Sequence, residues 1–271
     1  LNGRKLPGCG QATIRKTIVG LKASFNRAIK RGLLDSNPFV GQRLAKTQPK
    51  QKRIFSPGEI DALIAASPTL WWATFIRLAF TSGLRLGELL NTTWADIGES
   101  HITVTAKRPG TFTAGGRSYP VLAFSCKSHR ERRVPLDPEA AKLLQRLKLK
   151  SGGSIYPFLS LDRLAVLAAT RDTTQEINAA KLSNNVLRTF KLIQVQARAI
   201  LAKQRGVGID KVPWIVGCVH DMRKSFASLA AHHISMPELQ KILGHSSIVT
   251  TSEFYVDVSD DLGDRLKVAF A

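Results

Sequence analysis

The most informative segment of the chain is residues 81–97, which read TSGLRLGELLNTTWADI. An apolar run over residues 70–82 leads into it and predicts a helix. That helix should stop at Gly83, because glycine is the usual residue just after a helix end. A second, short helix is predicted over residues 86–91.

Arg85 lies between these two predicted helices in a largely apolar setting, where an unpaired charge is unfavourable. Glu88 follows three residues later, on the same helix face, and is its expected partner. The alternative is an ordinary surface ion pair that contributes little free energy.

Upstream of this segment the composition changes twice. Residues 11–31 carry apolar residues at helical spacing, and residues 42–53, QRLAKTQPKQKR, have the polar and basic composition of a linker. Residues 56–59, SPGE, form a capping box that begins a new helix. We therefore expect the end of a helical domain over residues 1–41, a basic linker over 42–54 and the main domain over 55–271.

Downstream, apolar residues at every second position predict short strands, and apolar residues at spacings of three and four predict helices. The expected fold class is mainly α with one small antiparallel β-sheet. The predicted strands are 101–105, 119–127 and 132–136, and the predicted helices are 137–149, 184–204 and three more after His220, after Pro237 and around Tyr255.

The charge points to a polyanionic partner. The chain has 40 Lys and Arg against 20 Asp and Glu, a net charge of +20. Such an excess favours nucleic acid, because basic side chains that neutralise phosphates release counterions. No signal peptide or long apolar run is present, so we expect a cytoplasmic protein without a membrane partner.

Metal and cofactor sites are not indicated by the sequence. The cysteines Cys9, Cys126 and Cys218 are far apart and form no Cys/His metal spacing. No phosphate-binding loop or dinucleotide fingerprint occurs either. We therefore expect no metal and no cofactor.

Four separated segments carry cations, histidines and one tyrosine. They read TSGLRLGELLNTTWADI (81–97), CKSHRERRVPL (126–136), HDMRKSFAS (220–228) and LGHSSIVTTSEFY (243–255). In this order they resemble the tyrosine recombinase (phage integrase) family over residues 55–271. Residues 11–40 resemble the last helices of that family's N-terminal core-binding domain. The resemblance implies the DNA breaking-rejoining fold of its catalytic domain.

The resemblance also implies how the cations act on DNA. Arg85 and Arg223 would hold the non-bridging oxygens of a scissile phosphate through bidentate hydrogen bonds, which suit the charge of the transition state. Lys127 would protonate the leaving 5′-oxygen. Arg130, Arg132 and Arg133 crowd the same predicted hairpin, so the assignment of this role to Lys127 rests on the motif.

The remaining implied residues are two histidines and a nucleophile. His220 would transfer a proton and His245 would bind the phosphate, for which imidazole is suited near neutral pH. Tyr255 would attack the phosphate to form a 3′-phosphotyrosyl bond, and nearby cations would favour its phenolate. For His245 a helix cap, and for Tyr255 a half-buried aromatic, are the structural alternatives.

Two features depart from the family pattern. His245 and Tyr255 are ten residues apart, one more than is common in the family. A looser loop, a shifted tyrosine or cleavage in trans by a partner's tyrosine would accommodate the difference. The basic stretch at 107–117 is either an insertion that contacts DNA or a hairpin without that role.

We expect a site-specific recombinase that acts on double-stranded DNA, with four protomers on two duplexes. A type IB topoisomerase-like enzyme is the enzymatic alternative. A DNA-binding regulator without catalysis is the alternative from another class.

Overall fold

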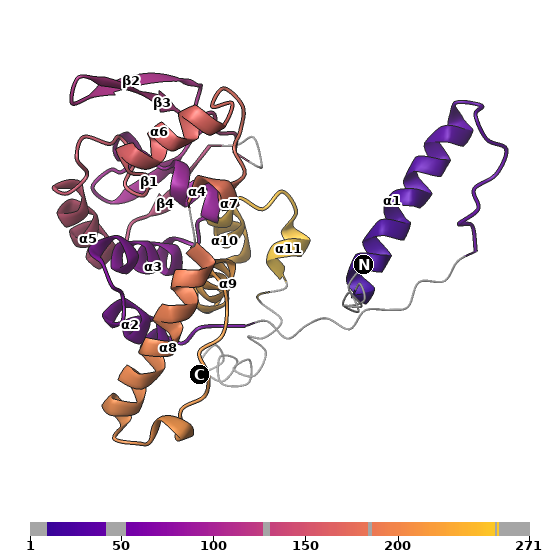
Figure 1. Cartoon of the computed structure of the whole chain (residues 1–271). Coiled ribbons are helices and arrows are strands. Elements are labelled where there is room, and N and C mark those ends of the chain that lie inside the picture. Colours follow the sequence, from indigo (N-terminus) through magenta and orange to yellow (C-terminus); the bar gives the residue numbers. More distant parts are fainter. Residues whose placement is uncertain (1–9, 42–52, 127–130, 184–185, 253, 255–271) are drawn as a thin grey trace, which may run out of the picture. The chain divides into compact units, whose positions relative to one another are not determined.

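The computed structural model describes residues 10–41, 53–126, 131–183, 186–252 and 254 of the 271-residue chain. The chain divides into two compact units, residues 1–51 and residues 52–271 (Figure 1). None of the helices in the described ranges is both long and apolar enough to cross a membrane.

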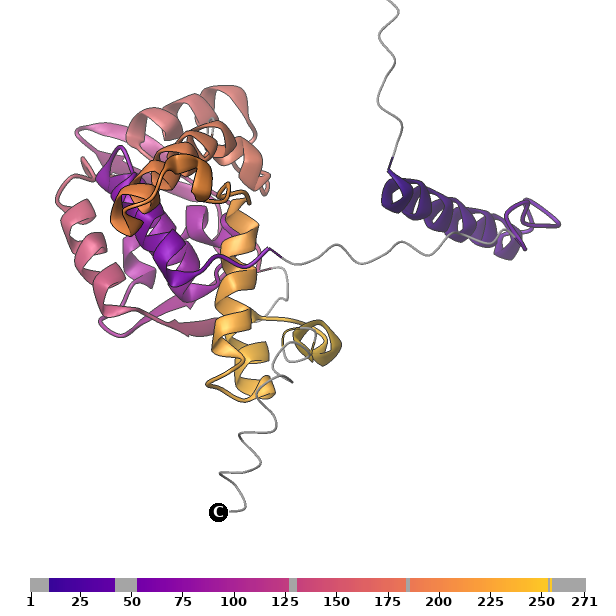
Figure 2. The same ribbon diagram turned by 90° about the horizontal axis from the view of Figure 1, so that it is seen from below.

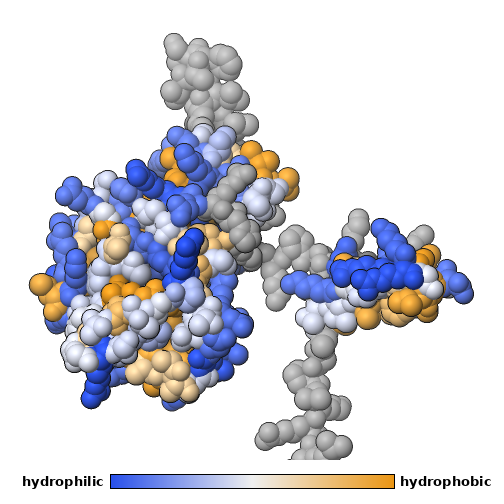
Figure 3. Space-filling model, turned by 90° about the horizontal axis from the view of Figure 1, so that it is seen from above, coloured by the Kyte–Doolittle hydropathy of each residue, from blue (hydrophilic) through white to orange (hydrophobic). Residues whose placement is uncertain are grey.

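The smaller unit contains the predicted helix, α1 (Gln11–Lys30). The chain leaves the helix at Gly32, whose φ is +67°, a conformation that favours glycine. The buried Asn37 side chain then donates hydrogen bonds to the Lys22 carbonyl (3.1 Å) and to Asn26 Oδ1 (2.7 Å). These bonds fix the turn after α1 against the helix. Hydrophilic and apolar atoms of this unit gather on opposite sides (Figure 3).

The larger unit is built around α3 (Leu70–Ser82), which packs against α2, α5 and α9. Phe75, Ile76 and Leu78 of α3 are fully buried, so this helix is the centre of the core. The predicted capping box at Ser56 is present and begins α2. The surrounding long helices are α2 (Pro57–Ala65), α5 (Pro138–Lys148), α8 (Val186–Arg205) and α9 (Val219–Ala230).

Two separate ribbons replace the single predicted sheet. β1 (His101–Val104) pairs with β4 (Arg132–Pro135), and β2 (Gly110–Ala114) pairs with β3 (Arg117–Val121), both antiparallel. The predicted strand 119–127 was wrong in extent. β3 ends at Val121, opposite the first residue of its partner β2, Gly110, and beyond this point the described chain is paired through an isolated bridge between Lys107 and Phe124.

Shorter elements complete the larger unit. Of these, α6 and α7 were not predicted. The helices α9, α10 and α11 lie together at one side of the unit (Figures 1 and 2), where α10 also contacts β4. The elements are α4 (Leu86–Asn91), α6 (Leu161–Thr170), α7 (Ala179–Leu182), α10 (Met236–Leu243), α11 (Ile248–Ser252) and the 3-10 turns η1 (Trp94–Asp96) and η2 (Ile209–Lys211).

Candidate active site

A tight turn between α3 and α4 presents Arg85. Gly83 ends α3 with a φ of +62°, and a Cβ at this position would meet Cδ1 of Phe226 at 2.4 Å. Both the backbone and the packing therefore require glycine. Glu88 accepts hydrogen bonds from the backbone N–H of Arg85 and from its Nη1, each 2.8 Å long. The carboxylate thus fixes the start of α4 and the direction of the Arg85 side chain.

Glu88 also binds a second guanidinium. Its Oε2 accepts a hydrogen bond of 2.6 Å from Nη2 of Arg132 on β4, and both side chains are buried. Burial alone would raise the pKa of Glu88, but the hydrogen bond and charge of Arg132, assisted by Arg85, lower it below its ordinary value. The carboxylate is therefore ionised at neutral pH.

Arg223 on α9 lies in the same cluster and is 4% exposed. Its Nη1 donates to the Gly83 carbonyl (2.6 Å), and its Nη2 donates to the Leu243 carbonyl (2.7 Å). Burial, followed by repulsion from Arg85, lowers the pKa of Arg223 to about 9, which leaves it protonated at neutral pH. Arg223 therefore joins the end of α3 to the end of α10.

His220 lies one turn before Arg223 on α9. Partial burial of the imidazole and the neighbouring charges of Lys224 and Arg223 lower the pKa of His220. A neutral imidazole can accept a proton, so His220 has the protonation state that a proton-transfer role requires.

His245 follows Gly244, which ends α10 with a φ of +65°. Its Nδ1 lies 3.0 Å from the Thr251 hydroxyl, and its ring stacks on that of Phe254 with centroids 6.4 Å apart. Burial, followed by repulsion from Arg223, lowers the pKa of His245 to about 4. The imidazole is therefore neutral at pH 7, and its Nδ1 either donates to or accepts from the Thr251 hydroxyl, depending on the tautomer.

Three pockets border the cluster, and one of them, of about 500 Å³, is lined by Arg132, Gly244 and His245 among others. Another, of about 190 Å³, is lined by His220, Arg223, His245 and Phe254 among others. A third, of about 470 Å³, opens beside Arg85. Guanidinium groups and neutral imidazoles therefore line space that an anion can enter. This is the arrangement expected of a site that binds a phosphodiester.

A model of the phage integrase family matches residues 53–261 of the chain. The chain belongs to the phage integrase family. This family membership confirms the resemblance drawn from the four motif segments.

Named relatives agree with this assignment. The chain is 26% identical over 270 residues to the tyrosine recombinase XerC-like protein of Caldanaerobacter subterraneus subsp. tengcongensis, covering 93% of this chain and 63% of the relative. It is 30% identical over 241 residues to the integrase of Escherichia phage HK022, covering 86% and 54% respectively. The chain thus spans between half and two thirds of the length of these two integrase-family relatives.

Solved structures confirm the predicted fold class. The Tn1549 transposon integrase in complex with transposon right end DNA superposes with a TM-score of 0.64 at 20% identity, over 96% of this chain and 81% of that one. A lambda integrase dimer bound to a COC' core site gives a TM-score of 0.60 at 20% identity, over 90% and 73%. The mainly helical catalytic-domain fold is shared with both integrases.

Two residues predicted for the integrase site, Lys127 and Tyr255, lie outside the described residues. The residues before them are described. Cys126 is buried, with its thiol 3.7 Å from the Val104 carbonyl of β1, and Phe254 lies against His245. The structure thus brings together Arg85, Glu88, His220, Arg223 and His245, and leaves the positions of the lysine and the nucleophile as predictions.

Arg132 and Thr251 belong to this cluster but were not predicted to belong to it. A signal for Arg132 was present in the sequence, because strand alternation places Arg132, Val134 and Leu136 on one face, and all three are buried. For Thr251 the sequence holds no comparable signal, since its contact with His245 depends on how the chain turns after α10.

The basic stretch at 107–117 is only partly available for DNA. Lys107 is bound internally, with Nζ 2.5 Å from both Asp96 Oδ1 and Thr105 Oγ1. The rest of the stretch covers β2 and the turn into β3, including Gly115 and Gly116 at positive φ. No group of three or more potential metal ligands occurs within the described ranges.

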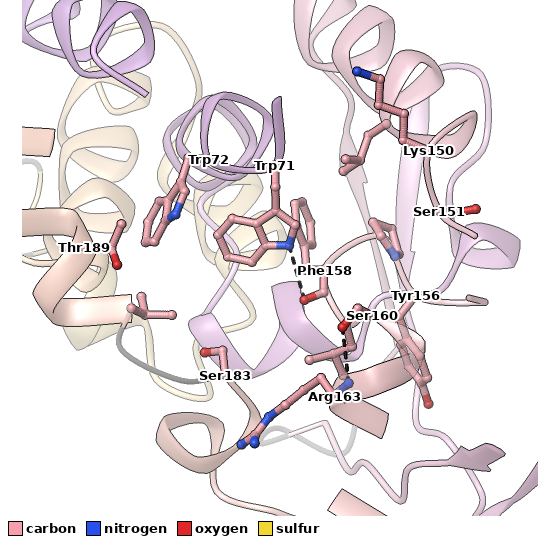
Figure 4. Close-up of a pocket in the computed structure, with 14 residues that line it drawn as sticks. Trp71, Trp72, Lys150, Ser151, Tyr156, Phe158, Ser160, Arg163, Ser183 and Thr189 are labelled. Carbon is pink, nitrogen blue, oxygen red and sulfur yellow. Dashed lines mark hydrogen bonds between the residues drawn. The ribbon is translucent and has the colours of Figure 1, made fainter. Parts of the chain in front are cut away.

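A separate pocket of about 390 Å³ lies among α3, α5, α6 and α8 (Figure 4). Trp71 in its wall donates to the Phe158 carbonyl (3.4 Å), and Arg163 Nε donates to the Leu182 carbonyl (2.8 Å). None of the residues predicted for the integrase site lines this pocket. Its polar groups bind the protein's own backbone, so we assign it no role in catalysis.

Proposed function

We propose that the chain is a site-specific DNA recombinase that cleaves and rejoins duplex DNA by transesterification. The observation that carries the proposal is the convergence of Arg85, Arg223, His220 and His245 from three separate motif segments onto one pocketed cluster. The net charge of +20 supports a DNA substrate.

In the proposed reaction Tyr255 attacks the scissile phosphorus. The bond from phosphorus to the tyrosine oxygen forms as the bond to the 5′-oxygen breaks, which leaves a 3′-phosphotyrosyl link and a 5′-hydroxyl. His220 accepts the phenol proton, and Lys127 donates a proton to the leaving oxygen. The phosphoester is conserved, so the scheme requires neither a metal ion nor a nucleotide cofactor, and reversal rejoins the strand.

The electrostatics of the described residues fit these roles. Hydrogen bonds to carbonyl and carboxylate groups hold Arg223 and Arg85 in place, so neither guanidinium has to be ordered when a phosphate binds. The pKa of His245 is about 4, so it would bind the phosphate as a neutral donor. That requires the Thr251 hydroxyl to donate to Nδ1, which leaves the proton on Nε2.

The organisation of the complex is also a proposal. We assign residues 1–41 to the end of a core-binding domain, 42–54 to a basic linker and 55–271 to the catalytic domain. A related lambda integrase has been solved as a tetramer bound to a Holliday junction, with a TM-score of 0.57 over 88% of this chain and 57% of that one. We propose the same arrangement here, four protomers on two duplexes.

One observation favours a second candidate, a DNA-binding regulator that does not cut. Phe254 lies against His245 and lines the pocket that contains Arg223. An aromatic side chain without a hydroxyl thus occupies part of the wall of this pocket, as expected of a chain that binds DNA without cutting it. No corresponding observation favours a topoisomerase.

A suicide-substrate assay tests the proposed function. The protein is mixed with nicked duplex DNA of its native attachment region in the presence of chelator, and denaturation-resistant protein–DNA adducts are measured. We expect an adduct from the natural protein and a loss of at least about 1,000-fold in Tyr255→Phe, because that variant lacks the nucleophile. An adduct that survives in Tyr255→Phe would contradict the assignment.

A swapped variant separates the two candidate functions. The double substitution Phe254→Tyr with Tyr255→Phe moves the phenol by one position and keeps the composition unchanged. If the natural chain cuts, the swap should reduce the adduct strongly. An adduct from the swapped chain alone would show that the natural chain is a non-cutting regulator.

A further inference from the structure

Arg132 is a buried cation with an unusual set of partners. Its side chain is 4% exposed. Nη2 donates to Glu88 Oε2 at 2.6 Å, and Nε donates to the Ile242 carbonyl at 2.8 Å. Its Nη1 is buried and has no hydrogen-bond partner among the described residues.

The α10 terminus is built around this guanidinium. A Cβ at Gly244 would lie 3.1 Å from Cζ, Nε and Nη1 of Arg132, so the glycine backbone packs directly on the guanidinium plane. Gly244 O in turn accepts a hydrogen bond of 3.3 Å from Nη2 of Arg85. The turn that carries His245 is therefore held between Arg132 and Arg85.

Arg132 thus connects three of the four motif segments. Through Glu88 it reaches the segment that holds Arg85, and through Ile242 it reaches the segment that holds His245. It lies on β4, five residues after Lys127 in the sequence.

We propose that Arg132 is a positioning residue of the active site: it sets the orientation of Glu88, and so of Arg85, and fixes the turn that carries His245. The proposal rests on the proposed recombinase function. Arg132 does not contact the phosphate, because two of its three nitrogens bind the protein and the third is inaccessible. Its effect on the reaction passes through these neighbours.

Variants at Arg132 and at its neighbour Arg133 test the proposal. Arg133 is the next residue on β4 and is exposed, so Arg133→Met removes the same charge without touching the cluster. We expect Arg132→Met to slow adduct formation by about 10- to 100-fold, as is usual for residues that orient reacting groups. DNA affinity should change less than about threefold in both variants, and Arg133→Met should keep the natural rate.

Arg132→Lys guards against a folding defect. Lysine keeps the charge and one bond to Glu88. Its ammonium group cannot also reach the Ile242 carbonyl, which the planar guanidinium of arginine does. We expect a folded protein with an intermediate rate. A natural rate in Arg132→Lys and Arg132→Met, or a loss of thermal stability with no change in rate, would overturn the proposal.

A methylphosphonate at the scissile position separates positioning from direct contact. This linkage lacks one phosphate charge. It should therefore partly restore the rate of adduct formation in Arg85→Ala, a variant that has lost a cation facing the phosphate. It should not restore Arg132→Met. Equal restoration of both variants would make Arg132 a phosphate ligand and would refute the positioning role.

A last measurement does not depend on cleavage. Inorganic phosphate is titrated into the natural protein and into Arg132→Met, and the His245 imidazole is followed by NMR. We expect a phosphate-dependent shift in the natural protein that is weakened in Arg132→Met. If the natural protein forms no adduct, the proposed function fails, but the phosphate titration still tests whether Arg132 orders the site. Identical His245 responses in the natural protein and in Arg132→Met would refute the positioning role of Arg132.

Discussion

Three guanidinium groups and one carboxylate form the centre of the site. Glu88 binds Arg85 and Arg132 directly, and Arg223 is held beside them by two backbone carbonyls. Burial, and after it repulsion from Arg85, lowers the pKa of Arg223. A bound phosphate anion would offset the repulsion among these cations, which favours the binding of a phosphate here.

His245 provides a measure of the same surroundings. Its pKa is about 4 against an ordinary value of 6.5, because of burial and the nearby arginines, and we expect phosphate or DNA to raise it. The folded-state pKa is the lower one, so the unfolded chain takes up the proton first as the pH falls. The contribution of His245 to stability is therefore complete above pH 6.5 and is lost as the pH falls toward about 4.

Histidine NMR titration measures the pKa, and urea unfolding across the same pH range measures the stability. The His245→Asn variant assigns the resonance. The free energy of unfolding of His245→Asn should also depend less on pH between 6.5 and about 4 than that of the natural protein. A DNA-free His245 that titrates at or above its ordinary value would contradict the account.

The sequence identified most of the described cluster, but not its geometry. Arg85, Arg223 and the two histidines were named from motifs, and the structure brings them together. Arg132 was treated as one of several hairpin cations, because arginine is normally exposed. Its burial follows from the alternation of β4 and from a carboxylate 44 residues earlier, a partner that local sequence does not reveal.

At the scale of elements, the α3–α4 turn controls the site. Gly83 supplies a positive φ, makes room for Phe226 and offers its carbonyl to Arg223. A side chain here would disturb all three.

We expect Gly83→Ala to lower the free energy of unfolding by at least about 2 kcal/mol, from the left-handed backbone and the clash combined. It should also abolish adduct formation. The matched control is Gly58→Ala in α2, where a Cβ meets nothing within 4 Å. That variant should gain about 0.5–1 kcal/mol, because alanine is the better helix former. Urea unfolding of both variants measures the difference, and equal stabilities would contradict it.

Elements with local signals were predicted well, and elements that depend on pairing were not. The helices 70–82 and 86–91 and the capping box at Ser56 follow from residues within a few positions of each other. The predicted strand 119–127 was wrong in extent because the end of β3 is set by β2, and the antiparallel strands form two ribbons because β1 pairs with β4 and β2 with β3. The helix α6 was missed although Ser160 caps it and Leu164 and Leu167 lie three residues apart, whereas α7 has four residues, too few to show a helical period.

At the scale of the whole molecule, the charge governs binding. With 40 basic and 20 acidic residues, the chain should lose affinity for duplex DNA steeply as salt rises. We expect a loss of about 1,000-fold between about 50 and 200 mM salt, typical of several phosphate contacts. Fluorescence anisotropy with labelled duplex measures this, and melting curves over the same range control for unfolding. An affinity that does not depend on salt would show that charge is not the main source of binding.

If the chain cuts DNA as proposed, the bonds of Arg223 also determine when during synthesis that activity can first appear. Its partners are the Gly83 carbonyl, 140 residues earlier, and the Leu243 carbonyl, 20 residues later. A nascent chain that has left the ribosome only as far as α8 carries Arg85 but lacks Arg223 and both histidines of the cluster, His220 and His245. Such a chain is basic enough to adhere to the genome but has no means of breaking it. In the proposed mechanism nicking competence should therefore arise abruptly, once Tyr255 has been synthesised and the distant segments have closed on one another.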